Sequence, residues 1–163
     1  MASDSKSKII VKKSGISGKG LFANSDIKKG EVLFVVKGKI HEFHPDDDDW
    51  QLPHAISYAQ HKWINPNPDN PLRYTNHSCD PNCIVTEGLK VIALKNIKNG
   101  SEITIDYSLT ETEPESRMGK CRCNSANCRG EIMPIQYLPK SVVDKNRKYL
   151  RKWIVDLYYG KKA

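Results

Sequence analysis

Apolar residues along the chain gather in short runs that favour β-strands. Such runs occupy residues 8–13, 32–36 and 90–95. They are rich in Val and Ile, and turns that contain glycine separate them. The run at 32–36 is unbroken, which predicts a strand buried on both faces. In residues 102–107 apolar and polar positions alternate, so Ile103, Ile105 and Tyr107 are predicted to share one face of a strand.

The C-terminal pattern is helical instead. Apolar residues recur at i, i+3 and i+4 between positions 141 and 159, namely Val142, Val143, Tyr149, Leu150, Trp153, Ile154 and Leu157. Lys140 and the basic residues at 145–151 supply the opposite face, and Gly160 marks the end. We expect one amphipathic helix over 139–160 that packs on the domain. A monomer is expected, and use of the apolar stripe as a dimer interface is the alternative.

Length and composition narrow the class of protein. The 163 residues suit one domain. No apolar run approaches the ~20 residues that cross a bilayer, and the N-terminus lacks the apolar core of a signal peptide. A soluble, intracellular protein is therefore expected, without a membrane partner. Lys and Arg concentrate near the two ends and leave a net charge of +7. Because they are not interleaved with aromatic residues, sequence-specific DNA binding is disfavoured, whereas weak association with chromatin or a nucleoid stays open.

Two polar segments interrupt the apolar pattern. Residues 41–50 combine two His with the acidic run Asp46–Asp49. A solvated loop is favoured over a metal site there, because the order lacks helical ligand spacing. Our hypothesis for the acidic run is attraction of a basic substrate segment. Residues 109–120 show no core pattern, which predicts a mobile connector.

The segment 73–83 reads R-Y-T-N-H-S-C-D-P-N-C and is too polar for a plain buried strand. It predicts a polar site that faces a ligand, with Cys79 reaching a metal. Three of the five cysteines follow as Cys-x-Cys-x4-Cys at 121–128, a spacing that favours metal over disulfide in a reducing compartment. A structural zinc site needs four ligands, so one must come from elsewhere in the chain.

With three further motifs, the segment resembles SET-domain protein lysine methyltransferases, whose signature is R-F-I-N-H-S-C-x-P-N-C. The other motifs are S-G-K-G-L-F-A at 17–23, G-S-E-I-T-I-D-Y at 100–107 and C-R-C-N-S-A-N-C-R-G at 121–130. The resemblance implies a mainly β SET fold of small curved sheets around a pseudo-knot. It divides the chain into a SET domain at 8–110, a zinc-binding post-SET segment at 117–133 and the C-terminal helix at 139–160.

The resemblance also implies S-adenosylmethionine as cofactor. Its expected contacts are Gly18, Lys19, Gly20, Tyr58, Arg73, Asn76 and His77. Other interpretations remain for some of these residues: a turn needs glycines in any case, Tyr58 suits a core position, and Asn76 with His77 suits a tight loop.

For the structural zinc, the resemblance adds Cys79 to Cys121, Cys123 and Cys128, with His77 in place of Cys79 as the alternative. Lys120, Arg122 and Arg129 are expected to offset the charge of four thiolates. Cys83 is then spare and expected to be buried as a small hydrophobic residue.

Tyr107 is implied as the residue at the methyl-transfer centre, with Ile105 beside it in the substrate channel, where a small side chain favours more than one methyl group. Many relatives have an aromatic residue before Gly38, where this chain has Val36 and Lys37. The implied substrate is a protein, such as a histone, with an exposed lysine in a basic segment. The compartment is the cytoplasm in a microbe, or the nucleus or chromatin in a eukaryote or for an exported effector. The rivals are a SET-like binding module with weak catalysis and a zinc-dependent nucleic-acid binder.

Overall fold

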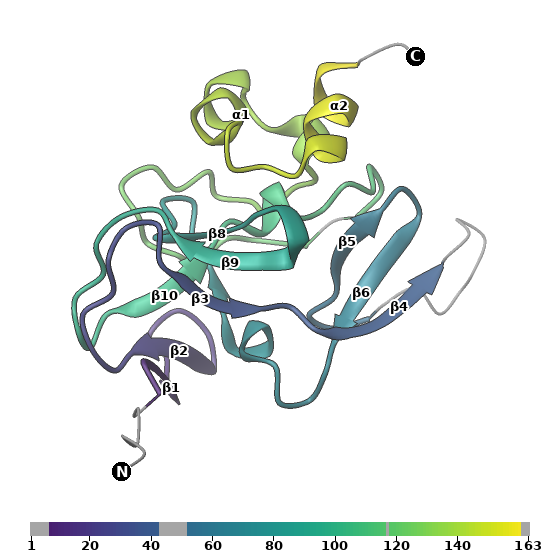
Figure 1. Ribbon diagram of the computed structural model, residues 1–163. Coiled ribbons are helices and arrows are strands. Elements are labelled where there is room, and N and C mark those ends of the chain that lie inside the picture. Colours follow the sequence, from purple (N-terminus) through teal and green to yellow (C-terminus); the bar gives the residue numbers. More distant parts are fainter. Residues whose placement is uncertain (1–6, 43–51, 117, 161–163) are drawn as a thin grey trace.

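Three small sheets form the body of the protein (Figure 1). The computed structural model describes residues 7–42, 52–116 and 118–160, so the run Asp46–Asp49 lies outside the described residues. The first sheet has the order β1-β2-β10-β7. Its strands are β1 (Ile9–Lys13), β2 (Lys19–Ala23), β10 (Glu102–Ile105) and β7 (Asn76–His77). The parallel pair β7–β10 places the central polar segment beside a strand that follows it by some 25 residues.

The second sheet has the order β3-β9-β8 and the third β4-β6-β5. Their strands are β3 (Val32–Val35), β9 (Lys90–Ala93), β8 (Cys83–Val85), β4 (Gly38–Glu42), β6 (Lys62–Pro66) and β5 (Ile56–Ala59). The prediction of two-faced burial for 32–36 is wrong. Because β3 is an edge strand, Val32 stays 48% exposed and Val35 37% exposed.

Within the described residues, short 3-10 helices occur at η1 (Pro71–Tyr74), η2 (Glu87–Leu89), η3 (Tyr107–Leu109) and η4 (Ile135–Tyr137), of which η1 connects two sheets and η3 and η4 follow the last strand. The strand β10 ends at Ile105, and Tyr107 already belongs to η3. The predicted alternation over 102–107 is therefore cut short. Thr104 and Asp106 are as buried as their apolar neighbours, because both faces of this strand are covered.

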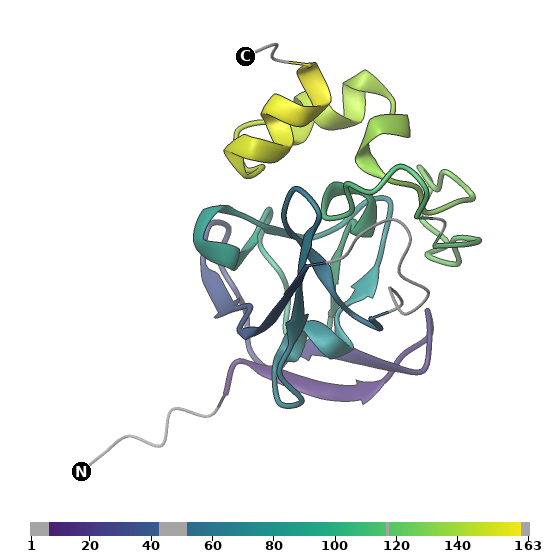
Figure 2. The same ribbon diagram turned by 90° about the vertical axis from the view of Figure 1, so that its right-hand side faces the viewer.

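The single C-terminal helix predicted over 139–160 is wrong. The structure has two helices, α1 (Lys140–Asn146) and α2 (Lys152–Tyr159), which lie together on one side of β8 and β9 (Figures 1 and 2). Arg151 breaks the helix with an extended backbone, and its buried guanidinium donates a hydrogen bond to the carbonyl of Ser57. The apolar period continues across the break, so the pattern alone conceals it. Gly160 ends α2 in the left-handed conformation, as predicted.

Two hydrophobic clusters hold these layers. The first lies between the sheets and includes Leu21, Val91 and Ile103. The second joins the C-terminal helices to β8 and η3 through Ile84, Leu109, Ile135, Leu138, Val143, Leu150 and Ile154. The helices therefore complete the core of the domain. Among the described residues, none of the helices has the length and apolar character needed to span a bilayer.

The first residues of the predicted mobile connector, 109–120, are packed into the fold. Residues 109–112 are buried, because Thr112 donates hydrogen bonds from its amide (3.1 Å) and hydroxyl (2.9 Å) to the hydroxyl of Ser57. The amide of Ser57 in turn donates to the carbonyl of Thr110 at 3.0 Å. The prediction of a segment without core contacts is therefore wrong for these four residues. Paired polar groups let a polar sequence enter the interior.

Candidate functional site

Tyr107 is fixed against the central polar segment. Pairing of β7 with β10 sets Asn76 opposite Thr104 and His77 opposite Ile105. The amide of Tyr107 donates to Nδ1 of His77 at 3.1 Å, and the phenol hydroxyl donates to the carbonyl of Thr75 at 2.7 Å. Burial and the charge of Glu102 raise the pKa of Tyr107 to about 12. The phenol is therefore neutral at physiological pH and is held in one orientation.

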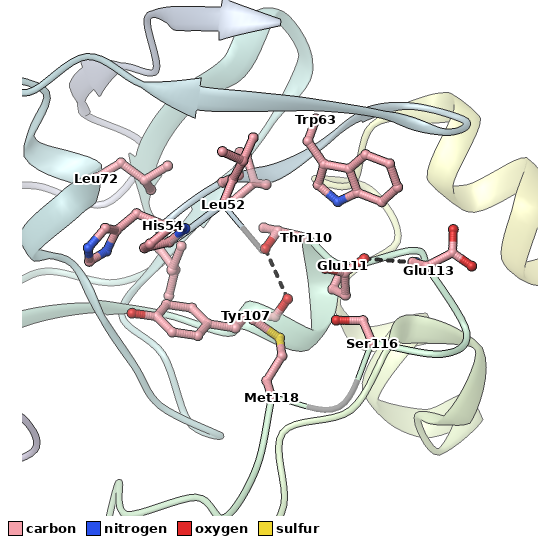
Figure 3. A pocket seen from close by; sticks show the side chains of 14 residues that line it. Leu52, His54, Trp63, Leu72, Tyr107, Thr110, Glu111, Glu113, Ser116 and Met118 are labelled. Carbon is pink, nitrogen blue, oxygen red and sulfur yellow. Dashed lines mark hydrogen bonds between the residues drawn. The ribbon is translucent and has the colours of Figure 1, made fainter. Parts of the chain in front are cut away.

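Two cavities meet at Tyr107, which lines both. One, of about 490 Å³, is called the basic cavity because Lys120 and Arg122 line it without any described carboxylate. Its other lining residues are Ile16, Ser17, Asn76, His77 and Ile132. The second, of about 440 Å³, is called the acidic cavity because Glu111 and Glu113 line it without any described Lys or Arg (Figure 3).

Asn76 connects the glycine-rich loop, residues 17–20, to the basic cavity. Its Nδ2 lies 3.1 Å from the carbonyl of Ser17, 3.2 Å from that of Lys19 and 2.8 Å from Oε1 of Glu102. A Cβ on Gly20 would stand 2.3 Å from the same Oε1 atom. Glycine at position 20 is thus required for Glu102 to reach Asn76. The loop and β7 form one hydrogen-bonded unit at the wall of the basic cavity.

The residues predicted to contact a cofactor are only partly brought together. Asn76 and His77 line the basic cavity, and Gly18, Lys19 and Gly20 adjoin it through Ser17. Tyr58 and Arg73 line neither cavity. Tyr58 is 40% exposed, and the Arg73 guanidinium donates to the carbonyl of Pro66 at 2.9 Å.

The acidic cavity is lined by apolar side chains and by two carboxylates. Leu52, Ile56, Trp63, Leu72, Ile105 and Met118 supply the apolar wall. In Figure 3 the ring of Tyr107 faces this space, and its hydroxyl points away from the end that holds Glu111 and Glu113. Burial raises the pKa of the Glu111 carboxyl, although the amides of Glu113 and Thr112 donate to it and oppose that shift.

Sequence reasoning missed most of this wall. It looked for an aromatic residue beside Gly38, but Val36 is buried in the core and lines neither cavity. Gly38 itself is explained by packing, since a Cβ there would stand 1.9 Å from the carbonyl oxygen of Asn65. The aromatic residues of the acidic cavity are Trp63 and Tyr107. The mixed aromatic and polar composition of 54–63 was the available signal for Trp63.

A cluster of His and Cys side chains next to the basic cavity could hold a metal ion. The ligand atoms of His77, Cys79, Cys121 and Cys123 lie within 4.8 Å of one another. The sulfurs of Cys79 and Cys121 are 3.7 Å apart. Two thiolates bound to one tetrahedral zinc at ~2.3 Å are about 3.8 Å apart. The spacing of these donors therefore fits zinc.

His77 is the less suitable ligand of this cluster. Its Nδ1 accepts a hydrogen bond from the amide of Tyr107, so the ring proton resides on Nε2, which faces the sulfur of Cys79 at 3.3 Å. Burial lowers the pKa of His77, against the opposing charge of Asp106, and keeps the ring neutral. A neutral ring protonated at Nε2 has no lone pair to offer a metal from that atom. It can instead orient Cys79.

Two cysteines, Cys128 and Cys83, lie outside this group of ligand atoms, and Cys123 within it has a lowered pKa. Cys128, a predicted ligand, is exposed and is not among the four grouped ligand atoms, although its thiol interacts with that of Cys121. Burial raises the pKa of Cys121, and this interaction adds to the rise. Burial disfavours the Cys123 thiolate, but hydrogen bonds from the Cys79 amide and from Ser125 outweigh burial and lower its pKa to about 6. Cys83 is fully buried in β8 with its pKa raised to about 12, which confirms the prediction of a small hydrophobic residue.

The cations near the cluster have different roles. The guanidinium of Arg129 donates to the carboxylate of Asp106 at 2.7 Å, and its amide donates to the sulfur of Cys79 at 3.4 Å. Asp106 is almost fully buried, so this is an internal ion pair beside the cysteines. Lys120 and Arg122, on either side of Cys121, line the basic cavity. The metal cluster and the basic cavity thus share one segment of chain.

Comparison with known proteins places this geometry in a family. The SET domain family model matches residues 18–108. Histone-lysine N-methyltransferase 2B of Homo sapiens is 29% identical over 150 residues, which cover 77% of this chain and 5% of that relative. Histone-lysine N-methyltransferase ASHH2 of Arabidopsis thaliana is 27% identical over 136 residues, which cover 73% of this chain and 8% of that relative. The histone-lysine N-methyltransferase dim-5 of Neurospora crassa, described as H3 lysine-9 specific, is 38% identical over 82 residues, which cover 38% of this chain and 25% of that relative.

This chain therefore spans a quarter or less of the length of these relatives. The family match nevertheless covers more than half of the chain and contains Gly18–Gly20, the Asn76–His77 pair and Tyr107. These are the elements that the structure gathers around the junction of the two cavities. The chain belongs to the SET-domain family.

Proposed function

We propose that the protein transfers methyl groups from S-adenosylmethionine to the ε-amine of a protein lysine. One observation carries the proposal: Tyr107 is the lining residue that two cavities of opposite charge character share. A transferase that binds donor and acceptor separately needs such a junction, because the reacting atoms must meet in line. The names of the relatives point to histones as the first substrates to test.

The basic cavity suits the methyl donor, which carries a carboxylate on its amino-acid portion. Lys120 and Arg122 provide positive charge, and the Asn76–His77 strand provides hydrogen-bonding groups. When bound, S-adenosylmethionine supplies an electrophilic methyl group. Ser17, at the start of the glycine-rich loop, also lines this cavity and is bonded to Asn76. Tyr58 and Arg73 have no place in this proposal, since neither lines the cavity.

The acidic cavity suits a lysine within a basic segment. The apolar wall formed by Leu72, Ile105 and Trp63 can cover the aliphatic stem, and Glu111 with Glu113 favours further positive charge on the same peptide. Ile105 is buried, and its side chain is smaller than the aromatic residue that many relatives have at this position. The smaller side chain leaves more room around the amine, which supports transfer of more than one methyl group. The methylation state of the product, read by mass spectrometry, tests that detail.

The amine must lose its proton before it can attack. A free lysine has a pKa of ~10.4, so about one molecule in a thousand is neutral near pH 7.4, a penalty of roughly 4 kcal/mol. Tyr107 is not the base, because its phenol stays protonated. The apolar wall lowers the pKa of the amine instead. The Tyr107 oxygen donates its own proton to Thr75, so its lone pairs are free to accept an N–H and orient the amine.

A structural zinc held by Cys79, Cys121, Cys123 and Cys128 completes the proposal. It would tie the post-SET segment at 117–133 to the SET domain at 8–110 through Cys79. Because Lys120 and Arg122 flank Cys121, such a tie fixes the positive wall of the basic cavity. Residue 117 lies outside the described residues.

Transfer of tritiated methyl groups to histones, nucleoid proteins and ribosomal proteins tests the function. We expect label on at least one basic protein, and Tyr107→Phe to lower kcat at least 100-fold, the order found when one positioned catalytic group is removed. The Kd of S-adenosylhomocysteine should change less than threefold, because the phenyl ring keeps both cavity walls. Binding of S-adenosylhomocysteine, the product of the methyl donor, without methyl transfer to any of these proteins would favour the alternative of a SET-like binding module. Unchanged kcat would remove Tyr107 from the mechanism.

A further inference from the structure

A strongly basic face lies on the C-terminal helices. Residues 140–152 contain six Lys or Arg against a single Asp. Two hollows of about 580 Å³ each share Lys145 and Lys148, so they flank the end of α1 and the turn after it. Lys29, before β3, and Lys95, after β9, extend one hollow, while Arg147 and Lys152 extend the other. The six basic residues of the two hollows are together called the C-terminal basic face: Lys29, Lys95, Lys145, Arg147, Lys148 and Lys152.

Part of this charge is already balanced within the protein. Lys95 pairs with Asp80 at 3.5 Å, and Lys152 pairs with Asp156. Lys29, Lys145 and Lys148 are exposed and have no carboxylate partner among the described residues. Three lysines from two distant stretches of sequence thus line one hollow with their charges unpaired, while the two carboxylates of that hollow, Asp80 and Asp106, are paired with Lys95 and Arg129. Such a concentration of like charge attracts a polyanion.

The aromatic residues on this face favour phosphate over bases. The guanidinium of Arg147 lies 4.5 Å from the ring centre of Tyr159, and the ammonium of Lys148 lies 4.9 Å from that of Tyr149. Each cation covers a face of its ring, and both rings are half-buried. Stacking of unpaired bases needs open aromatic faces. The rings instead hold the cationic groups in place at the surface.

We propose that the C-terminal basic face binds the phosphate backbone of double-stranded nucleic acid without reading its sequence. A duplex presents one negative charge per ~1.7 Å of its axis, so it can engage Lys29, Lys145 and Lys148 together. Contacts to phosphate position a protein on a duplex and carry no sequence information. The three lysines line neither the basic nor the acidic cavity, although their hollow also borders Cys79 and the Arg129–Asp106 ion pair. Their substitution therefore leaves the walls of both cavities in place.

Fluorescence anisotropy with a labelled duplex of about 30 base pairs, between 50 and 200 mM salt and without methyl donor, tests the proposal. The wild type should bind with an affinity that falls steeply with salt. The triple variant Lys29→Gln, Lys145→Gln and Lys148→Gln should bind at least tenfold more weakly at 100 mM salt. Its log–log salt slope should become shallower by about 2.7, since each phosphate contact contributes about 0.9.

The matched control is Lys12→Gln, Lys13→Gln and Lys39→Gln, which removes the same charge from exposed positions of β1 and β4. Strand β1 lies at the opposite end of the molecule from the helices (Figures 1 and 2). We expect less than a threefold loss of affinity. An equal loss in both triple variants would assign binding to net charge and overturn the proposal.

Two further results would also overturn it. One is a single strand of the same length that binds more tightly than the duplex. The other is poly-glutamate that displaces the duplex at equal charge concentration, which would point to an acidic protein as partner. Methyl transfer to a free peptide should change less than twofold in the triple variant. Because duplex binding is measured without the donor, its outcome holds whether or not the protein proves to be a methyltransferase.

Discussion

The two cavities that meet at Tyr107 differ in how their walls are built. The wall of the basic cavity comes from segments with dense, ordered motifs: the glycine loop, the Asn76–His77 strand and the cysteine segment. Most of the wall of the acidic cavity comes from residues 52–56, Trp63, residues 110–116 and Met118, which lie outside the SET-family motifs, and only Ile105 and Tyr107 in it belong to one of them. A ligand of fixed structure requires fixed chemistry around it. A wall that only needs to be apolar and acidic can be assembled from many sequences.

The cavities also differ in charge, and that difference makes them separable by experiment. Positive residues line the basic cavity and carboxylates line the acidic one. A change confined to one wall should therefore move one ligand constant and leave the other alone. Tyr107 is shared, so its substitution should affect turnover.

The largest effect is expected where the basic cavity depends on the metal cluster. Cys121→Ser removes a proposed zinc ligand between Lys120 and Arg122. We expect bound zinc, measured by atomic absorption, to fall from about one ion per chain to nearly none. Binding of S-adenosylhomocysteine should weaken at least 100-fold, because structural zinc supplies ~10 kcal/mol or more of folding energy to its segment.

Cys83→Ala is the control for that change, because its thiol is buried in β8 away from the cluster. It should keep the zinc and cost about 1 kcal/mol of unfolding free energy. Retention of zinc by Cys121→Ser would show that the four-thiolate assignment is wrong.

The two cavities also differ in how far the sequence could predict them. The segment 73–83 predicted a polar site, and the structure places its Asn76–His77 pair beside Tyr107, because the motif sets the types and order of these residues. The burial of Glu111 and Thr112 was not predictable, since it depends on hydrogen bonds to Ser57, more than fifty residues earlier.

The break between α1 and α2 escaped prediction for the same reason. Arg151 is 3% exposed, and its buried guanidinium bonds to Ser57, also a distant residue. Helical periodicity records which residues are apolar along a segment. It holds no information on which carbonyl a buried arginine will reach. Long-range polar pairing thus accounts for both errors.

On the basic side, Asn76→Ala should weaken S-adenosylhomocysteine about 30-fold by calorimetry. The substitution removes the amide that ties the carbonyls of Ser17 and Lys19 to β7, and loss of two hydrogen bonds is worth about 2 kcal/mol. The KM for a peptide substrate should change less than threefold. Asn24→Ala, at the end of β2, serves as control and should leave both constants unchanged. A peptide KM that rises as much as the product Kd would contradict separate cavities.

On the acidic side, Glu113→Gln should raise the KM for a basic peptide about fivefold and leave the product Kd unchanged. Loss of one partly exposed charge near a cationic ligand is worth about 1 kcal/mol, and the effect should shrink in 0.5 M salt. Glu115→Gln is the matched control, since Glu115 is exposed and does not line the cavity. Equal effects of the two substitutions would show that the cavity does not recognise charge.

The smallest effect concerns the pH dependence of stability at Glu111. Burial raises the pKa of this carboxyl above 4.5, its ordinary value, so the folded state binds its proton more tightly than the unfolded state. Its contribution to stability is therefore fully present below pH 4.5 and is lost as the pH rises through the folded pKa. Glu111→Gln mimics the protonated form. In urea unfolding, the wild type should lose stability relative to this variant between pH 4.5 and 7.5, and a difference independent of pH would contradict the assignment.

The most direct test asks whether both ligands occupy the protein at once. S-adenosylhomocysteine is titrated by calorimetry into the free protein and into protein saturated with a lysine peptide that it methylates. Two cavities joined at Tyr107 predict one product molecule bound per chain in both titrations, with Kd values within threefold of each other. A Kd that rises in proportion to the peptide concentration would mean that the two ligands compete for one space, and the account would fail.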